Sequence, residues 1–94
     1  YQGAKGAVRL MTKSAGLEYA QQGVRVNSVH PGIIETPLAK TMGDEQMQAI
    51  IASTPMARVG RPIDIATMSL FLCTDEAAFI TGAEFVVDGG WGAQ

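Results

Sequence analysis

Residues 24–32 read VRVNSVHPG, a short run of alternating residues that lies between a helical pattern and a Pro-Gly pair. Val24, Val26 and Val29 are interspersed with polar residues, as is typical of a strand, and the Pro-Gly pair that follows ends the pattern. We therefore predict a strand over residues 24–30. The residues before it have a helical pattern, so a helix would lead directly into this strand. That order indicates a parallel sheet.

The preceding helix is predicted over residues 1–22. Gly23 then suits the left-handed position that commonly ends a helix. Apolar side chains recur along two stripes of this helix, so it needs covering on two sides. One stripe consists of Ala4, Val8, Met11, Ala15 and Tyr19, and the other of Ala7, Leu10 and Leu17.

The rest of the chain predicts two more helices and a second strand. Residues 36–56 form an excursion with a proline near each end, and within it residues 44–53 have apolar residues at helical spacing. A helix over residues 62–73 begins with a proline and is apolar nearly all round, so it is expected to be sandwiched or to lie at a subunit interface. Residues 83–88 predict a strand that a Gly-Gly pair ends.

Two strands and three helices are too few for a closed α/β domain. A two-stranded parallel sheet leaves both outer edges unpaired, and its faces need helices on both sides. The chain also opens on tyrosine and not on methionine. We therefore expect residues 1–94 to be the C-terminal part of a larger doubly wound, parallel-sheet, Rossmann-like α/β domain whose N-terminal half is absent.

The composition argues against several classes of function. Seven basic and nine acidic residues give a net charge of −2, and the basic residues are scattered, so no nucleic-acid surface is indicated. No apolar run is long enough to span a membrane and no signal peptide is visible, so we expect a soluble, cytoplasmic protein. One cysteine and one histidine allow neither an internal disulfide nor a clustered metal site. Cys73 is expected to be a small core residue.

Tyr1 and Lys5 are the candidate proton-transfer pair. Four residues apart on a helix, they would share one face, one turn apart. A free tyrosine has a pKa of about 10, and a neighbouring cation lowers it by favouring the phenolate. The phenol could then exchange protons near neutrality. An ordinary helix face can carry the same two residues, so the pair needs support from the rest of the chain.

That support comes from five short motifs that follow one another over nearly all 94 residues. In this order and spacing they resemble the C-terminal part of a short-chain dehydrogenase/reductase. A tyrosine and a lysine at this spacing are common by chance, whereas the five together are specific. The motifs are Tyr1-x-x-x-Lys5, Arg25-Val26-Asn27, the Pro31-Gly32 run ending at Thr36, Gly60-Arg61-Pro62, and Thr81-Gly82 followed by Val87-Asp88-Gly89-Gly90.

The resemblance implies an oxidoreductase that interconverts a secondary alcohol and a ketone by hydride transfer with NAD or NADP. Tyr1 would be the catalytic acid in reduction and the base in oxidation. Lys5 would hold the nicotinamide ribose and lower the pKa of the tyrosine. Residues 37–56 would form a lid over a small carbonyl or alcohol substrate. Helices of this kind meet their copies in the family, so the parent would be a homodimer or homotetramer.

The resemblance also implies a cofactor wall after the first strand. Backbone atoms would pack against the nicotinamide ring, with the Ile34 amide as a candidate contact to its carboxamide and the Thr36 hydroxyl reaching the carboxamide or the pyrophosphate. Glycine in this wall would let the ring approach the backbone closely. The wall residues are Pro31, Gly32, Ile33 and Ile34.

The resemblance limits what this chain can do by itself. The family's glycine-rich phosphate turn, its catalytic serine and asparagine, and the residue that separates NAD from NADP all lie upstream of its tyrosine. We therefore expect the 94 residues alone to be inactive, and the choice between NAD and NADP stays open. Two alternatives remain: a non-catalytic homologue or truncated piece with a structural role, and an enzyme of the same fold that acts as a dehydratase or epimerase.

Several residues have a plain structural interpretation beside the functional one. His30 is expected to be a structural histidine, although it is the only imidazole and lies near the predicted wall. Asn27 is expected to fasten neighbouring backbone. Thr36 could cap a turn, and Pro31-Gly32 could simply end a strand. Trp91 could seal a subunit interface or border the substrate. Methionines at positions 42, 47 and 56 could pack or line an adaptable pocket.

Overall fold

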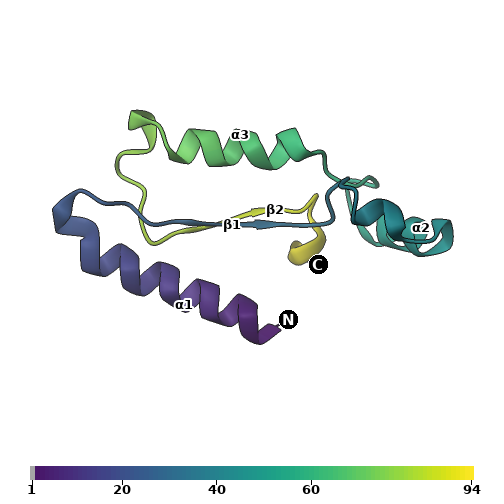
Figure 1. The fold of residues 1–94 in the computed structure, drawn as a ribbon, viewed down its shortest axis with the longest axis horizontal. Helices are drawn as coiled ribbons and strands as arrows, with labels where there is room; N and C mark the ends of the chain where they lie inside the picture. The colour runs from purple at the N-terminus through teal and green to yellow at the C-terminus, as the bar shows by residue number, and fades with distance from the viewer. Residues whose placement is uncertain (1) are drawn as a thin grey trace. The chain divides into compact units, whose positions relative to one another are not determined.

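The computed structural model describes residues 2–94 (Figure 1). Tyr1, the predicted acid-base residue, lies outside the described residues. The elements are, in chain order, α1 (Gln2–Tyr19), a 3₁₀ turn (Ala20–Gln22), β1 (Ser28–Pro31), a 3₁₀ turn (Ala39–Thr41), α2 (Asp44–Ser53), α3 (Pro62–Leu72), a 3₁₀ turn (Asp75–Ala77), β2 (Glu84–Val87) and a 3₁₀ turn (Trp91–Ala93).

The chain divides into two compact units. The first consists of the residues up to Val29 together with Ser69–Phe85, and the second of His30–Met68 together with Val86–Gln94. Helix α1 therefore belongs to the first unit and α2 to the second. Within residues 2–94, no helix is both long and apolar enough to cross a membrane.

Strands β1 and β2 pair as a two-stranded sheet (Figure 1). The Ser28 amide donates to the Ala83 carbonyl at 3.0 Å, and the Gly32 amide donates to the Val87 carbonyl at 3.0 Å. Both bonds join residues at the same offset along the chain, which is the pattern of parallel strands. The predicted parallel pairing is confirmed.

The first helix ends where the sequence predicts, but a different face of it is buried. Gly23 ends the helical region in the left-handed conformation, with φ 77°. Thr12 and Gly16 are buried, whereas Met11 and Leu17 of the two apolar stripes are 69% and 82% exposed. A Cβ on Gly16 would lie 2.8 Å from the Cα of Gly82, so only the smallest residue lets the helix approach the turn before β2. The described residues do not cover the apolar stripes.

The first strand is shorter than predicted. The prediction began it at residue 24 and ended it before Pro31, but β1 runs from Ser28 to Pro31. The residues before it are held in another way. The Val26 amide donates to the Thr81 hydroxyl at 3.1 Å, and the Val26 carbonyl accepts from the Gly82 amide at 2.7 Å. A side chain takes the place of a ladder bond here, so the regular strand begins later.

Arg25 and Asn27 fix this region by bonding to backbone. The Arg25 guanidinium donates to the Leu72 carbonyl at 2.7 Å, which satisfies one of the unpaired carbonyls at the end of α3. The Asn27 amide donates to the Ile80 carbonyl at 3.0 Å, and its oxygen accepts from the Ala83 amide at 3.1 Å. The structural role expected of Asn27 is thus confirmed.

The remaining elements follow the prediction with small shifts. Helix α2 has the predicted bounds, α3 ends one residue early at Leu72, and β2 is one residue shorter at each end. The expectation that Cys73 lies in the core is wrong, because its side chain is exposed. The helix has already ended at Leu72, which takes the buried position, and Cys73 falls in the turn that follows.

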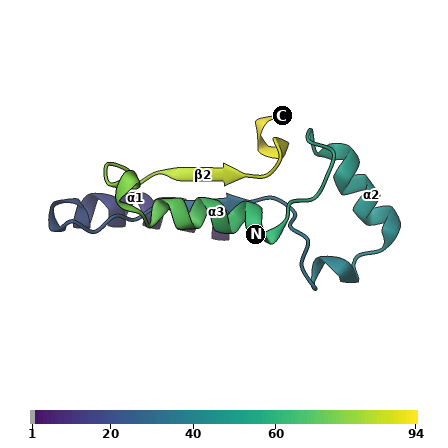
Figure 2. The ribbon, with the colours of Figure 1, turned by 90° about the horizontal axis from the view of Figure 1, so that it is seen from above.

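The predicted excursion is present within the second unit. Figure 2 shows the chain leaving the end of β1, passing through α2 and returning to the start of α3. At its base, Ile34 and Gly60 form an isolated parallel bridge. The two ends of this excursion are therefore fastened to each other.

Candidate functional site

A cavity of about 210 Å³ lies in the second unit. Three of the predicted wall residues, Gly32, Ile33 and Ile34, line it. Met56 and Trp91 contribute apolar surface on its other sides. Three residues of the predicted wall therefore border a cavity whose lining combines apolar side chains with charged ones, a mixture suited to part of a small organic molecule.

The bridge to Gly60 leaves the backbone N–H and C=O of Ile34 pointing away from Gly60. The Gly60 amide donates to the Ile33 carbonyl at 2.9 Å, and the Glu35 amide donates to the Gly60 carbonyl at 2.8 Å. In a parallel bridge the flanking residues make both bonds, so the N–H and C=O of the central residue face the opposite edge. The Ile34 amide and carbonyl can therefore serve a bound molecule.

Gly32 is required by packing within the protein. A Cβ at this position would lie 2.8 Å from the Cβ and 2.9 Å from the Cα of Asp88. Ordinary carbon contacts are about 3.5–4.0 Å, so no side chain fits. The sequence interpretation assigned this glycine to close approach of the cofactor, whereas the structure gives a second reason, the close approach of β1 to the end of β2.

Asp88 organises the turn after β2. Its carboxylate accepts from the Gly90 amide at 2.9 Å and from the Gly92 amide at 2.9 Å. The carbonyl of Gly89 accepts from the Met56 amide at 3.1 Å. The Val-Asp-Gly-Gly motif thus builds a turn that fastens the returning end of the excursion beside the cavity.

Thr36 acts as a turn cap. Its hydroxyl oxygen accepts from the Ala39 amide at 3.2 Å, and its carbonyl accepts from the Lys40 amide at 3.1 Å. This contact matches the plain interpretation of Thr36. It leaves the hydroxyl proton available, because a hydroxyl can accept one bond and donate another.

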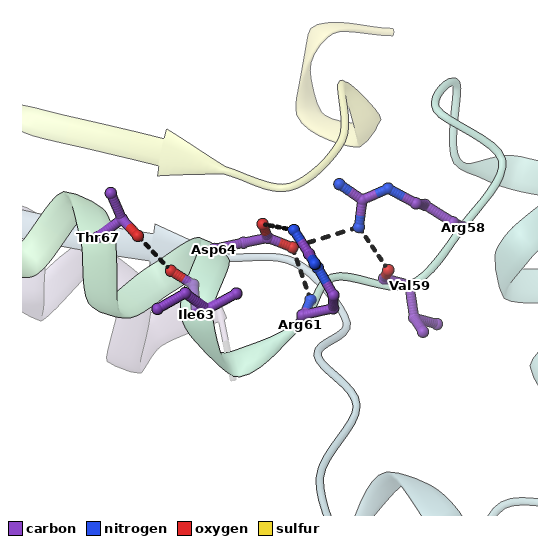
Figure 3. Close-up of polar contacts among 6 residues, drawn as sticks. All are labelled: Arg58, Val59, Arg61, Ile63, Asp64 and Thr67. Carbon is purple, nitrogen blue, oxygen red and sulfur yellow. Dashed lines mark hydrogen bonds and ion pairs between the residues drawn. The ribbon is translucent and has the colours of Figure 1, made fainter.

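Asp64 anchors a cluster at the start of α3 (Figure 3). Its Oδ2 accepts from the Arg61 amide at 2.7 Å and from Arg58 Nη1 at 3.2 Å, and its Oδ1 accepts from Arg61 Nη2 at 3.3 Å. The bond from the Arg61 amide, then the Arg61 and Arg58 side chains, lower the pKa of Asp64 from 3.8 to about 2. The carboxylate is therefore charged throughout the neutral range.

This pKa shift predicts a stability change at acid pH. The folded protein favours the ionised form of Asp64. The contribution of this carboxylate to the free energy of unfolding is therefore complete above pH 4 and disappears as the pH falls toward about 2. We expect Asp64→Asn to lower the stability of the full-length protein at neutral pH and to match wild type near pH 2. Urea unfolding at several pH values measures this. Asp75→Asn, an exposed carboxylate, is the control, and a pH-independent difference would contradict the prediction.

The other predicted site residues are placed as follows. Lys5 is half-buried on α1 in the first unit and is engaged in an interaction. Pro31 is exposed at the end of β1 and does not line the cavity. His30 is buried, at 7% exposure, and also has an interaction partner, which suits the structural role expected of it. Among residues 2–94, no cluster of three or more potential ligands could hold a metal ion.

Sequence reasoning did not single out two charged residues that line the cavity, Arg58 and Asp64. The available signal was the Arg-x-Gly-Arg-Pro-x-Asp spacing, in which an acid at the third helical position can reach back to the residue before the helix. Met56 and Trp91, left open between packing and a pocket, both line the cavity, whereas Met42 and Met47 do not.

Comparison with known proteins identifies the family to which this chain is similar. A family model described as enoyl-(acyl carrier protein) reductase matches residues 1–92. The NADP-dependent (R)-specific alcohol dehydrogenase of Lentilactobacillus kefiri is 53% identical over 97 residues, covering 100% of this chain and 38% of that protein. The chain thus spans well under half the length of this curated relative.

Solved structures that superpose on this chain are also dehydrogenases. A putative 2-deoxy-D-gluconate 3-dehydrogenase from Agrobacterium tumefaciens with bound NADP superposes with a TM-score of 0.94 at 36% identity, covering 100% of this chain and 39% of that one. A 4-hydroxyisoleucine dehydrogenase complexed with NADH gives 0.93 at 37% identity, covering 98% and 39%. These likenesses confirm the α/β, Rossmann-like fold class. By its sequence and by its fold, this chain belongs to the short-chain dehydrogenase/reductase family.

Proposed function

We propose that these residues belong to an NAD- or NADP-dependent oxidoreductase that interconverts a secondary alcohol and a ketone. The support is family membership, together with relatives that are named as dehydrogenases and solved with NADP or NADH. Because one neighbour holds NADP and another NADH, the proposal covers both. We also propose that residues 1–94 are the C-terminal part of the domain, since the relatives are much longer.

The observation that carries the proposal is the bridge between Ile34 and Gly60. It presents a backbone donor and acceptor, the N–H and C=O of Ile34, at the border of a cavity. A nicotinamide carboxamide carries the complementary acceptor and donor. The residues present therefore fit this group, with Gly32 and Ile33 continuing the wall beside Ile34.

Each remaining residue has one proposed task. The bound nicotinamide would supply or accept the hydride. Tyr1 would give a proton to the carbonyl oxygen in reduction and take it back in oxidation. Lys5 would bind the ribose and favour the tyrosine phenolate through its charge. Thr36 would donate its hydroxyl proton to the carboxamide or the pyrophosphate while its oxygen caps the turn.

Residues 37–56 are proposed to be the substrate lid. They contain α2 and lie within an excursion whose base is closed by the Ile34 to Gly60 bridge. The returning end is fastened at Met56, whose amide donates to Gly89. The leaving end turns at Ala39–Thr41, where Ala39 is buried.

Self-association of the parent is proposed because the family resemblance implies that such helices meet their copies, and residues 2–94 leave large apolar side chains uncovered. Leu17 on α1 and Leu70 on α3 are 82% and 69% exposed, and Phe79 is fully exposed. Exposed apolar area of this kind marks surfaces that pack against other protein. We expect sedimentation of the full-length protein to give a homodimer or homotetramer, and a stable monomer at micromolar concentration would contradict this.

We also propose a cytoplasmic location, in keeping with a single unpaired cysteine.

Label transfer tests the reaction. With reduced cofactor carrying deuterium at the transferable position, and a panel of small ketones, we expect the full-length enzyme to place deuterium on the carbinol carbon of the alcohol product. Mass spectrometry of the product measures it. Turnover that leaves the label in the cofactor would indicate a dehydratase or epimerase and would reject the proposal.

A further inference from the structure

Asp64 fastens the segment that precedes its own helix. Figure 3 shows Arg58 and Arg61 converging on its carboxylate. Arg58 Nη1 also donates to the Val59 carbonyl at 3.0 Å, so the same guanidinium holds both the carboxylate and the local backbone. The Arg61 amide, at 2.7 Å, makes the shortest of these contacts. Arg58 and Arg61 are thus bound directly to Asp64, and Val59 is held through Arg58.

Gly60 lies in the middle of that segment and is the residue that pairs with the wall. It makes two backbone bonds, one to Ile33 and one from Glu35, that fix Ile34 between them. A Cβ on Gly60 would lie 2.6 Å from Ile34 Cδ1, so the two residues are already in close contact. A shift of residues 58–61 would therefore displace Ile34.

We propose that Asp64 is a positioning residue, which holds residues 58–61 so that Gly60 keeps the Ile34 backbone where it binds the nicotinamide carboxamide. This inference rests on the proposed function. Asp64 does not touch the cofactor in this scheme. It acts through Arg58 and Arg61, then through Gly60, on the wall.

A role limited to capping the helix would not require the contact between Asp64 and Arg58. The bond from the Arg61 amide is by itself the capping contact, and a neutral side chain could accept it. The Arg58 contact adds nothing to the helix, because Arg58 lies outside it. Both arginine side chains are about half exposed or more, at 47% and 64%, so their ion pairs contribute less to global stability than the bond from the Arg61 amide. Their effect is on where the segment lies.

The test compares two ligands of the full-length protein. Reduced cofactor uses the wall, whereas ADP-ribose, or its 2′-phosphate for an NADP enzyme, lacks the nicotinamide. Asp64→Asn keeps an acceptor for the Arg61 amide and removes the charge. We expect it to raise the dissociation constant of the reduced cofactor about threefold to tenfold, the effect of one misplaced hydrogen bond, and to leave that of ADP-ribose unchanged. Fluorescence and calorimetric titrations measure the two.

Three further variants separate the proposed role of Asp64 from a general effect of the substitution. Arg58→Met breaks the same contact from the other side without touching the helix start, and it should give the same selective loss. Asp64→Glu, which restores the charge, should recover part of the affinity, and Asp75→Asn should change neither constant.

Equal weakening of both ligands would overturn the inference in favour of a general structural role, and so would no change in either ligand. A wild-type protein that binds ADP-ribose as tightly as reduced cofactor would instead reject the proposed nicotinamide site itself, and the inference with it.

Discussion

Tyr1→Phe in the full-length protein is expected to lower kcat by about 10²- to 10⁴-fold, the usual worth of a positioned acid-base group. Phenylalanine keeps the ring and its packing and removes only the hydroxyl that gives or takes the proton. Cofactor binding should therefore stay within a few-fold of wild type. Steady-state kinetics in both directions, with cofactor titration beside them, measure the two effects separately.

Tyr19→Phe is the matched control. Tyr19 ends α1 and is 39% exposed, so its substitution makes the same chemical change outside the proposed site. We expect its kcat to equal that of wild type. If Tyr1→Phe kept more than about a tenth of wild-type turnover, Tyr1 could not be the acid. If both variants lost activity together, the effect would come from the helix.

The order of the elements could be predicted from the sequence because each depends on local signals. Helix α2 has the predicted bounds, with Asp44 and Glu45 in its first turn suiting the positive helix end. The start of β1 could not be predicted in the same way. Val26 is held by the Thr81 hydroxyl, 55 residues away, and alternation of apolar residues carries no trace of that contact.

In the candidate site, too, residues marked by a local motif could be predicted and contacts that depend on the fold could not. Gly32, Ile33 and Ile34, which line the cavity, were singled out through the resemblance of the Pro31-Gly32 run to the family's motif, whereas Pro31 from the same run does not line it. The contact between Arg58 and Asp64 could not be predicted, since it depends on a turn that brings residue 58 back beside the start of α3. The burial of Thr12 and Gly16 was missed for a related reason: apolar stripes show which residues prefer burial, and not which face the rest of this chain covers.

Gly32→Ala is expected to be the most damaging substitution among the site glycines that keep an ordinary backbone conformation. The new methyl group would meet Asp88 Cβ at 2.8 Å and Cα at 2.9 Å. A backbone Cα cannot rotate away, so β1 and the end of β2 would have to separate. Overpacking of this kind costs about 1–3 kcal/mol, which for a protein of this family's size lowers Tm by roughly 3–10 °C.

Gly6→Ala provides the matched control, because Gly6 lies within α1 and, beyond its neighbouring residues in the helix, no atom of residues 2–94 is within 4 Å of its Cβ position. Alanine is the better helix former, so this variant should unfold at or slightly above the wild-type temperature. Differential scanning calorimetry of the full-length protein measures both. A Gly32→Ala variant as stable as Gly6→Ala would mean that the contact with Asp88 is relaxed, and that only close approach of a cofactor ring requires glycine at this position. Reduced-cofactor affinity, measured on the same samples, would then fall although Tm does not. If the strands do part as expected, both quantities fall, because residues 32–34 move with β1.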